Sequence, residues 1–220
     1  MTKQCIRPTS ATTLLICVVL SLLQLRVEAL NVVIAGGTGE VGRALSAKLA
    51  SEGHSVTILC RNSFLASAPA RVSSDFGWLG EGFLSKHPTI KLRDWDGGDL
   101  LDIVGQDWMG WQDDALPQAD ALINLCGGFT EQRVLASERL VGESLRLNPT
   151  ILQVTVSPKD EEMKLIAPLV YRPVAIPRLK TCEDLVKNNC PNFELMRLEA
   201  NMIELEAERI KQTVYKRLGH

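Results

Sequence analysis

The stretch Leu30-Asn-Val-Val-Ile-Ala-Gly-Gly-Thr-Gly-Glu-Val-Gly-Arg43 decides the fold of this chain. A short β-branched run enters a cluster of glycines, and a helix-forming stretch begins at Arg43, so we expect a strand, a tight turn and a helix. Glycines in such a turn permit positive φ and let the backbone approach a pyrophosphate closely. This context predicts a dinucleotide-binding turn rather than a plain glycine-rich loop. Its expected lining residues are Gly36, Gly37, Thr38, Gly39, Glu40, Val41 and Gly42.

Length and composition indicate one ordinary α/β domain. The chain has 220 residues, of which 45% are hydrophobic and 23% charged, with a net charge of -2. This length suits one domain better than two. Nothing in the composition suggests disorder or a nucleic-acid partner.

The first 29 residues are expected to be a signal peptide, separate from the domain at 30–220. Lys3 and Arg7 provide a positive flank, Ala11 to Leu25 is apolar, and Val27-Glu28-Ala29 resembles a cleavage site. The apolar run is shorter than the roughly 20 residues of a membrane-spanning helix, so an uncleaved anchor is the alternative. Removal of this segment takes away three basic residues and one acidic residue. The mature chain then has 21 basic and 25 acidic residues, a net charge of -4.

A signal peptide places the protein in the secretory pathway or in an organelle supplied by it, including a complex plastid. The four cysteines that remain, Cys60, Cys126, Cys182 and Cys190, lack CxxC spacing. Cys60 and Cys126 fall at expected strand ends, where a buried thiol is usual. Cys182 and Cys190 could pair in an oxidising lumen, and the sequence leaves this open.

The residue after the second expected strand bears on which dinucleotide is bound. Ser55 to Cys60 is that strand, and Arg61 follows it where an acidic residue would hold the ribose hydroxyls of NAD. A guanidinium instead suits the 2′-phosphate of NADP. We therefore expect NADP, with NAD less favoured; the alternative for Arg61 is a solvated surface residue. His54, just before the strand, is expected to be a loop residue.

Strands and helices alternate along the rest of the chain, which predicts a doubly wound parallel sheet with helices on both faces. Residues 62–90 are expected to form a loop with one short helix, and 171–177 a proline-interrupted loop. The helix at 130–147 is expected to bury Val134, Leu135, Leu140, Val141, Leu145 and Leu147. Further strands are expected at 89–95, 119–125, 151–157 and 193–198, and further helices at 179–188 and 200–218.

Two other features bear on binding. The fourth strand ends in Asn124-Leu-Cys126-Gly127-Gly, where the glycines leave room for the nicotinamide-side ribose, although a simple tight turn would need them too. Asn124, Cys126 and Gly127 are therefore expected cofactor residues. Trp95, Trp108 and Trp111 form a local aromatic cluster without a basic stripe, which favours packing over nucleic-acid binding.

The segments described so far resemble the short-chain dehydrogenase/reductase superfamily, in its extended or atypical NAD-dependent epimerase/dehydratase branch. The resemblance covers 31 to about 157, and its second and third segments are closest to a sugar-nucleotide epimerase-like subgroup. These three segments are VVIAGGTGEVGRAL with VTILCRN, WDG with ADALINLCG, and FTEQR through ASERLV. The resemblance implies a Rossmann fold, here with a reduced or absent substrate lobe because the chain ends soon after the sixth strand.

The resemblance also implies a proton-transfer site made of a YxxxK pair and a Ser at the end of the fifth strand. Ser157 matches the Ser and Lys180 the Lys, but the Tyr position is Ile176, and Tyr171 lies nine residues before Lys180. No YxxxK occurs in the chain. Two readings follow. One is an NADP(H)-binding epimerase/dehydratase-like protein, such as a reductase of a small or sugar-linked carbonyl compound. The other is a non-catalytic nucleotide-binding scaffold or redox sensor whose C-terminal helix contacts a protein partner.

Overall fold

The computed structural model describes residues 28–73, 77–95, 97, 110–127, 131–158, 172–198 and 202–220. The expected signal segment up to residue 27, Trp108 and Tyr171 lie outside these residues. No helix in the described part of the chain is both long and apolar enough to cross a membrane.

The described strands form one six-stranded parallel sheet in the order β3-β2-β1-β4-β5-β6. The first strand, β1 (Asn31–Ala35), pairs with β2 (Ser55–Cys60) on one side and β4 (Ala121–Asn124) on the other. The chain then adds β3 (Ile90–Asp94) at one edge and β5 (Leu152–Ser157) and β6 (Phe193–Arg197) toward the other. This order reverses direction between β1 and β4, as in doubly wound dinucleotide-binding sheets. The chain has a Rossmann fold.

Burial along the strands explains their order. Every residue of β4 and β5 and the last four of β1 are buried, as parallel strands covered on both faces require. The outer strands differ: β6 is half-buried throughout, and Ile90 is the only buried residue of β3. The apolar runs therefore occupy the centre of the sheet.

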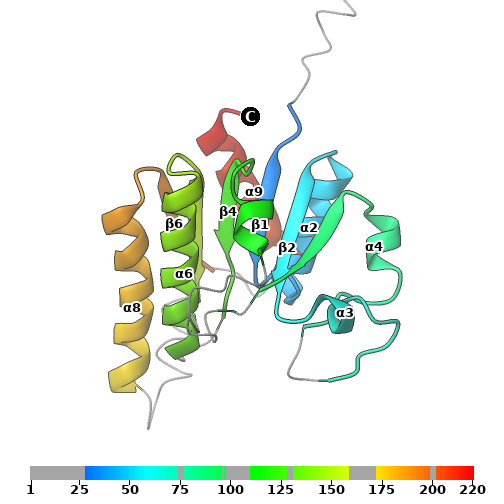
Figure 1. Ribbon diagram of the computed structural model, residues 1–220, viewed down its shortest axis with the longest axis horizontal. Helices are drawn as coiled ribbons and strands as arrows, with labels where there is room; N and C mark the ends of the chain where they lie inside the picture. The colour runs from blue at the N-terminus through cyan, green and yellow to red at the C-terminus, as the bar shows by residue number, and fades with distance from the viewer. Residues whose placement is uncertain are drawn as a thin grey trace, which may run out of the picture.

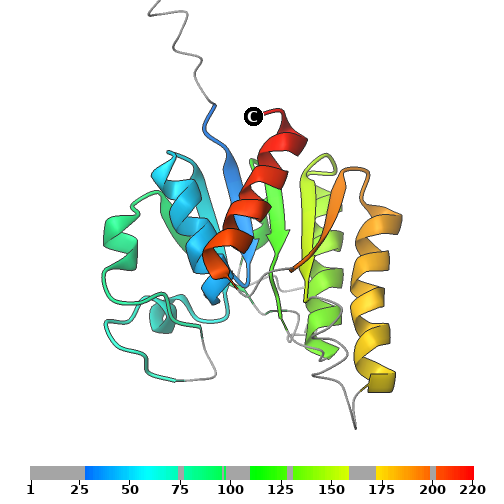
Figure 2. The ribbon, with the colours of Figure 1, turned by 180° about the vertical axis from the view of Figure 1, so that it is seen from behind.

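Helices cover both faces of the sheet (Figures 1 and 2), as expected. On one face, α2 (Glu40–Ser51) and α9 (Ile203–Leu218) pack Leu45, Leu49 and Ile210 against the strands. On the other face lie α5 (Trp111–Ala115), α6 (Glu131–Leu147) and α8 (Arg172–Asn189). The connection from β2 to β3 holds two short helices, α3 (Ser63–Ala66) and α4 (Phe83–Lys86), where one was expected.

The helix before β6 differs from the expectation. We expected a loop at 171–177, but α8 begins at Arg172 and Pro177 lies inside it. A proline in a helix removes one hydrogen bond to the preceding turn and costs about 3 kcal/mol. Packing offsets this cost, because Leu179, Cys182 and Val186 are all buried.

The buried face of α6 also differs. Leu140 and Val141 are buried as expected, whereas Val134, Leu135, Leu145 and Leu147 are only partly buried. The remaining fully covered positions of α6 are small or polar: Arg133, Ala136, Ser137 and Ser144. The face that meets the sheet is therefore rotated from the most apolar one, and it buries a charged residue near the start of the helix.

His54 lies in the loop between α2 and β2, as expected. Its side chain is buried beneath the amino ends of the strands, and its Nε2 lies 2.6 Å from the hydroxyl of Tyr215 in α9. Tyr215 in turn donates to Glu52, which also accepts from Lys211. This network joins the end of α2 to the terminal helix at the edge of the sheet opposite the glycine turn.

Candidate functional site

The glycine turn connects β1 to α2 at the carboxyl edge of the sheet, and close packing requires glycine at Gly36 and Gly42. Gly36 has φ +78°, and a Cβ there would lie 2.8 Å from the carbonyl of Leu125. A Cβ on Gly42 would lie 2.5 Å from the Cα of Gly37. The glycine turn therefore packs against the end of β4, and the first helical turn of α2 packs against the glycine turn.

Gly39 differs from Gly36 and Gly42. It precedes α2 in extended conformation, with φ -71°, and no side chain caps the helix. A Cβ at Gly39 would make only an ordinary contact, 3.4 Å from the oxygen of Gly36. Packing within the described residues therefore does not require a glycine at this position. The first amides of an uncapped helix, together with its dipole, suit an anion.

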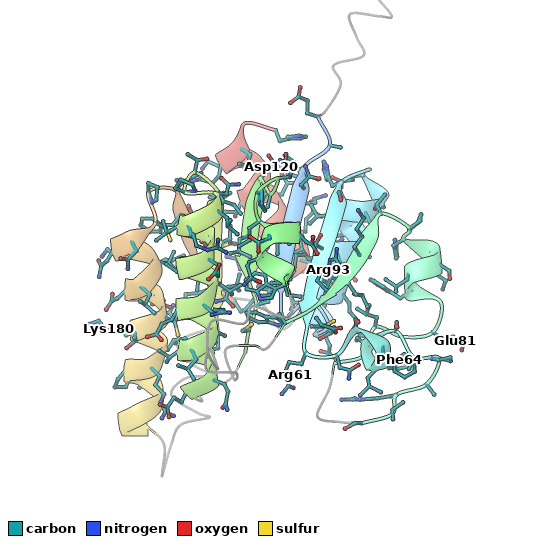
Figure 3. All side chains as sticks on the ribbon, viewed as in Figure 1. Arg61, Phe64, Glu81, Arg93, Asp120 and Lys180 are labelled. Atoms are coloured by element: carbon teal, nitrogen blue, oxygen red, sulfur yellow. The ribbon has the colours of Figure 1, made fainter. Side chains whose placement is uncertain are left out.

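Arg61 lies where the sequence predicts, directly after β2 at the carboxyl edge. It is exposed, and Figure 3 shows its side chain below the sheet, on the side to which the strands run. A Cβ on Gly97 would lie 3.7 Å from Arg61 Cγ, so the backbone after β3 passes beside the arginine stem. Arg61 itself lines the adjoining hollow.

The end of β4 is shaped by its own side chains. Asn124 is buried: its Oδ1 accepts from the backbone N–H of Cys126 at 3.0 Å, and its Nδ2 donates to Ser137 of α6 at 3.2 Å. Asn124 thus holds the backbone that follows β4, while Cys126 and Gly127 line the adjoining hollow. Burial raises the pKa of the Cys126 thiol to about 12, although the positive charges of Arg133 and Arg61 act to lower this pKa. The thiol is therefore protonated at neutral pH and is not a nucleophile there.

Two hollows adjoin at this edge of the sheet, one on each side of the glycine turn. The Arg61 compartment, of about 510 Å³, is lined by Thr38, Cys60, Arg61, Trp95 and Cys126 among others. The Val156 compartment, of about 380 Å³, is lined by Gly39, Glu40, Val41, Gly42, Val156 and Pro158 among others. Gly36, Gly127 and Arg133 line both. Together the compartments run across the point where the strand order reverses, which is where doubly wound sheets bind ligands.

Arg133 is the site residue that sequence reasoning missed. It is the third residue of α6 and only 3% exposed, yet it lines both compartments. Its Nη2 donates to the carbonyl oxygen of Val156 at 3.2 Å and lies 3.4 Å from Ser157 Oγ. A signal was present: Arg133 shares a helical face with Ala136 and Leu140, and a cation on a buried face is unusual.

Ser157 lies at the end of β5, as expected, but its hydroxyl faces α8. The hydroxyl donates to Glu183 Oε1 at 2.8 Å, and Arg197 of β6 holds both oxygens of Glu183 at 2.8 and 2.9 Å. Ser157 lines neither compartment. The structure therefore connects Ser157 to a polar chain linking β5, α8 and β6, with Arg133 at its groove end.

Lys180 is exposed on α8. Figure 3 shows it on the outer side of that helix, away from Arg61 and the glycine turn. It lines a separate hollow of about 330 Å³ that shares no residue with either compartment. Ile176, at the position of the absent tyrosine, is 40% exposed in the same hollow. The structure thus does not bring Lys180 into the groove, and its catalytic role stays a prediction.

The remaining sequence signals have structural explanations in the described residues. Trp95 and Trp111 are buried and meet edge to face, with ring centroids 5.6 Å apart, which confirms their packing role. Cys60, Cys126, Cys182 and Cys190 are all free thiols. No group of side chains within the described part of the chain could hold a metal ion.

The sequence matches no protein-family model, and no curated protein matches it. Several solved structures share its fold. FolM alternative dihydrofolate reductase 1 from Brucella canis, complexed with NADP, has a TM-score of 0.56 at 16% identity, covering 84% of this chain and 87% of that one. NmrA, described as a negative transcriptional regulator and solved with NADP, has a TM-score of 0.51 at 17% identity over 77% of this chain and 45% of its own. Vestitone reductase from alfalfa has a TM-score of 0.51 at 14% identity, over 76% and 56% respectively.

The chain spans about half the length of NmrA and of vestitone reductase. At such identities the likeness establishes the fold alone. These structural neighbours are NmrA and two reductases, and NmrA and FolM were solved with NADP.

Proposed function

We propose that this protein binds NADP(H) in the groove formed by the two compartments, and that it binds NAD(H) less tightly. The observation that carries this proposal is the placement of the uncapped start of α2 at a groove that crosses the β1–β4 switch point. Arg61 stands on the adenosine side of that groove, where it suits a 2′-phosphate. Neighbours of the same fold were solved with NADP.

The proposed activity is that of an epimerase/dehydratase-like reductase acting on a small or sugar-linked carbonyl compound. Bound NADPH supplies a hydride for such a reduction. The protein supplies the walls of the Val156 compartment, which are largely apolar at Val41, Leu125, Val156 and Leu198 and would exclude water from the nicotinamide side. Ser157 and Lys180 are the proposed catalytic residues, but the hydroxyl of Ser157 must leave Glu183 before it can reach a substrate.

A second candidate is a non-catalytic dinucleotide-binding protein. Its support is the bonding of Ser157 to Glu183, the placement of Lys180 on the outside of α8, and Ile176 at the tyrosine position. The start of α9 presents exposed Met202, Ile203 and Leu205, a surface that could contact a protein partner. The structural neighbour NmrA is described as a negative transcriptional regulator and was solved with NADP.

The test of NADP selectivity compares NADPH with NADH on the wild type and on Arg61→Ala, by fluorescence or calorimetry. Loss of charge-assisted hydrogen bonds to the 2′-phosphate should weaken NADPH about 10- to 100-fold and leave NADH unchanged. Equal loss for both dinucleotides would remove the selectivity claim. Turnover of carbonyl compounds by the wild type would then favour the reductase over the scaffold.

We also propose a cellular location for the protein: the secretory pathway or an organelle supplied by it, a plastid included. An uncleaved membrane anchor is less favoured. Imaging a fluorescent fusion of the whole chain tests this location. A signal diffuse in the cytosol would contradict it.

A further inference from the structure

We infer that Arg133 binds the pyrophosphate of the dinucleotide, at the boundary between the two halves of the groove. This inference rests on the proposed function, because it assigns a residue to a ligand that the groove is proposed to hold. It concerns a part of the ligand that NADP and NAD share, and so it is independent of the role of Arg61.

Arg133 lies where the two compartments meet. It shares the boundary of the two compartments with Gly36 and Gly127, the first glycine of the turn and the glycine after β4. A dinucleotide that lies across both compartments has one nucleoside in each, and its pyrophosphate crosses the boundary between them. The uncapped start of α2, beyond Gly39, lines the Val156 compartment, and the N–H of Gly39 donates to the carbonyl oxygen of the boundary residue Gly36 at 3.1 Å.

The charged side chains that line the two compartments also favour a phosphate next to Arg133. Among the described residues that line the compartments, Arg61 and Arg133 are the cations and Glu40 is the anion. Arg61 lines only the adenosine side. Arg133 is therefore the cation placed at the middle of the groove, where two phosphates carry charge and the dipole of α2 alone contributes only about half a unit charge.

The guanidinium of Arg133 is held in one orientation by its surroundings. Arg133 is 97% buried, and its Nη2 is held by the carbonyl of Val156 at the end of β5. The planar guanidinium is thus fixed before a ligand arrives, so it loses less conformational freedom on binding than a long exposed side chain would. A guanidinium fork matches phosphate oxygens in a way that a lysine ammonium does not.

The test measures binding of NADPH, NADH and adenosine 2′-monophosphate to the wild type, Arg133→Gln and Arg61→Gln by calorimetry. Arg133→Gln should weaken NADPH and NADH by the same factor, about 10- to 100-fold, and leave adenosine 2′-monophosphate unchanged. Arg61→Gln should do the converse, weakening NADPH and the monophosphate while sparing NADH. The matched control is Arg146→Gln, which changes an exposed arginine of the same helix that pairs with Glu143 and should leave all three affinities unchanged.

The outcomes separate the two proposals. If the folded wild type binds neither dinucleotide, the proposed function fails. If it binds them and Arg133→Gln binds both with wild-type affinity, only the role of Arg133 is overturned.

Should Arg133→Gln fail to fold, the wild type itself provides the readout. The guanidinium Nε–H resonance of Arg133, assigned with Arg133→Lys, should shift with NADPH and with NADH but not with adenosine 2′-monophosphate. A resonance that does not move at saturating NADPH contradicts the inference.

Discussion

The imidazole of His54 accepts a hydrogen bond at Nδ1 from the backbone N–H of Leu30, at 3.1 Å, and thereby fixes the residue before β1 to the end of α2. Because Nδ1 accepts, the proton of the neutral ring lies on Nε2, which faces the hydroxyl of Tyr215 at 2.6 Å. The residue that begins the fold is therefore tied to the terminal helix through one side chain.

This arrangement predicts a pH-dependent stability. Burial lowers the pKa of His54 below its usual 6.5; His220 and Lys211 add to this effect, and Glu52 opposes it. The unfolded chain therefore takes up the proton first as pH falls. The contribution of His54 is complete above about pH 6.5 and is lost as pH falls toward the folded pKa, by at most about 1.4 kcal/mol per pH unit.

Urea unfolding of the wild type and of His54→Ala, between pH 5 and pH 8, measures this contribution. The difference in unfolding free energy between the two should shrink as pH falls below 6.5. A difference that stays constant across the range would show that His54 does not titrate with folding.

The glycines of the turn and of α6 should respond in opposite directions to the same substitution. Gly42→Ala places a Cβ 2.5 Å from the Cα of Gly37 and should lower stability by about 1–3 kcal/mol. Gly142→Ala is the matched control: Gly142 lies within α6, and a Cβ there would meet nothing within 4 Å. It should raise stability by up to about 1 kcal/mol. Thermal unfolding of the two variants checks this, and a stabilising Gly42→Ala would refute the packing of the turn.

The thiols should be unreactive in the folded protein. Cys60, Cys182 and Cys190 are buried and free, and burial raises the pKa of Cys60 and of Cys126 to about 12. Titration with an aromatic disulfide reagent at pH 7.5 should therefore be slow in buffer and fast in guanidinium chloride, without a reductant. Two fewer thiols in guanidinium than after reduction would show a disulfide and contradict the free cysteines of the structure.

Lys180 and Ser157 should differ in what they support. Lys180→Ala changes an exposed residue outside the groove, so stability should change by less than about 0.5 kcal/mol and NADPH affinity should stay the same. Ser157→Ala removes the hydrogen bond to Glu183 and should cost about 1 kcal/mol. If the wild type turns over a carbonyl substrate, unchanged turnover in Lys180→Ala removes Lys180 from the mechanism, and its loss with intact NADPH binding supports the catalytic role.

The local parts of the fold could be predicted from the sequence, because their causes are local. The glycine turn, the strand Ser55–Cys60 and the position of Arg61 follow from composition and spacing along a few residues, and the structure has all three as predicted. The predicted start of α8 was wrong because a proline such as Pro177 locally disfavours a helix. Its packing partners lie in α6 and β6, and no local pattern reveals them.

The same distinction explains the site. Gly36 to Gly42 line the groove or shape its turn because one strand-turn-helix places them, and Cys126 and Gly127 line it because they follow β4 closely. Arg133, His54 and the turning of Ser157 toward Glu183 depend on contacts between residues 23 to 161 positions apart. Such contacts follow from the tertiary arrangement of whole helices, which a single sequence does not display.

The most direct test of the central claim is calorimetric titration of the purified protein with NADPH. We expect saturable binding at one site per chain, with an affinity that falls as salt rises because charged groups meet the phosphates. A folded protein that shows no saturable binding of NADPH or NADH would show that the groove is not a dinucleotide site.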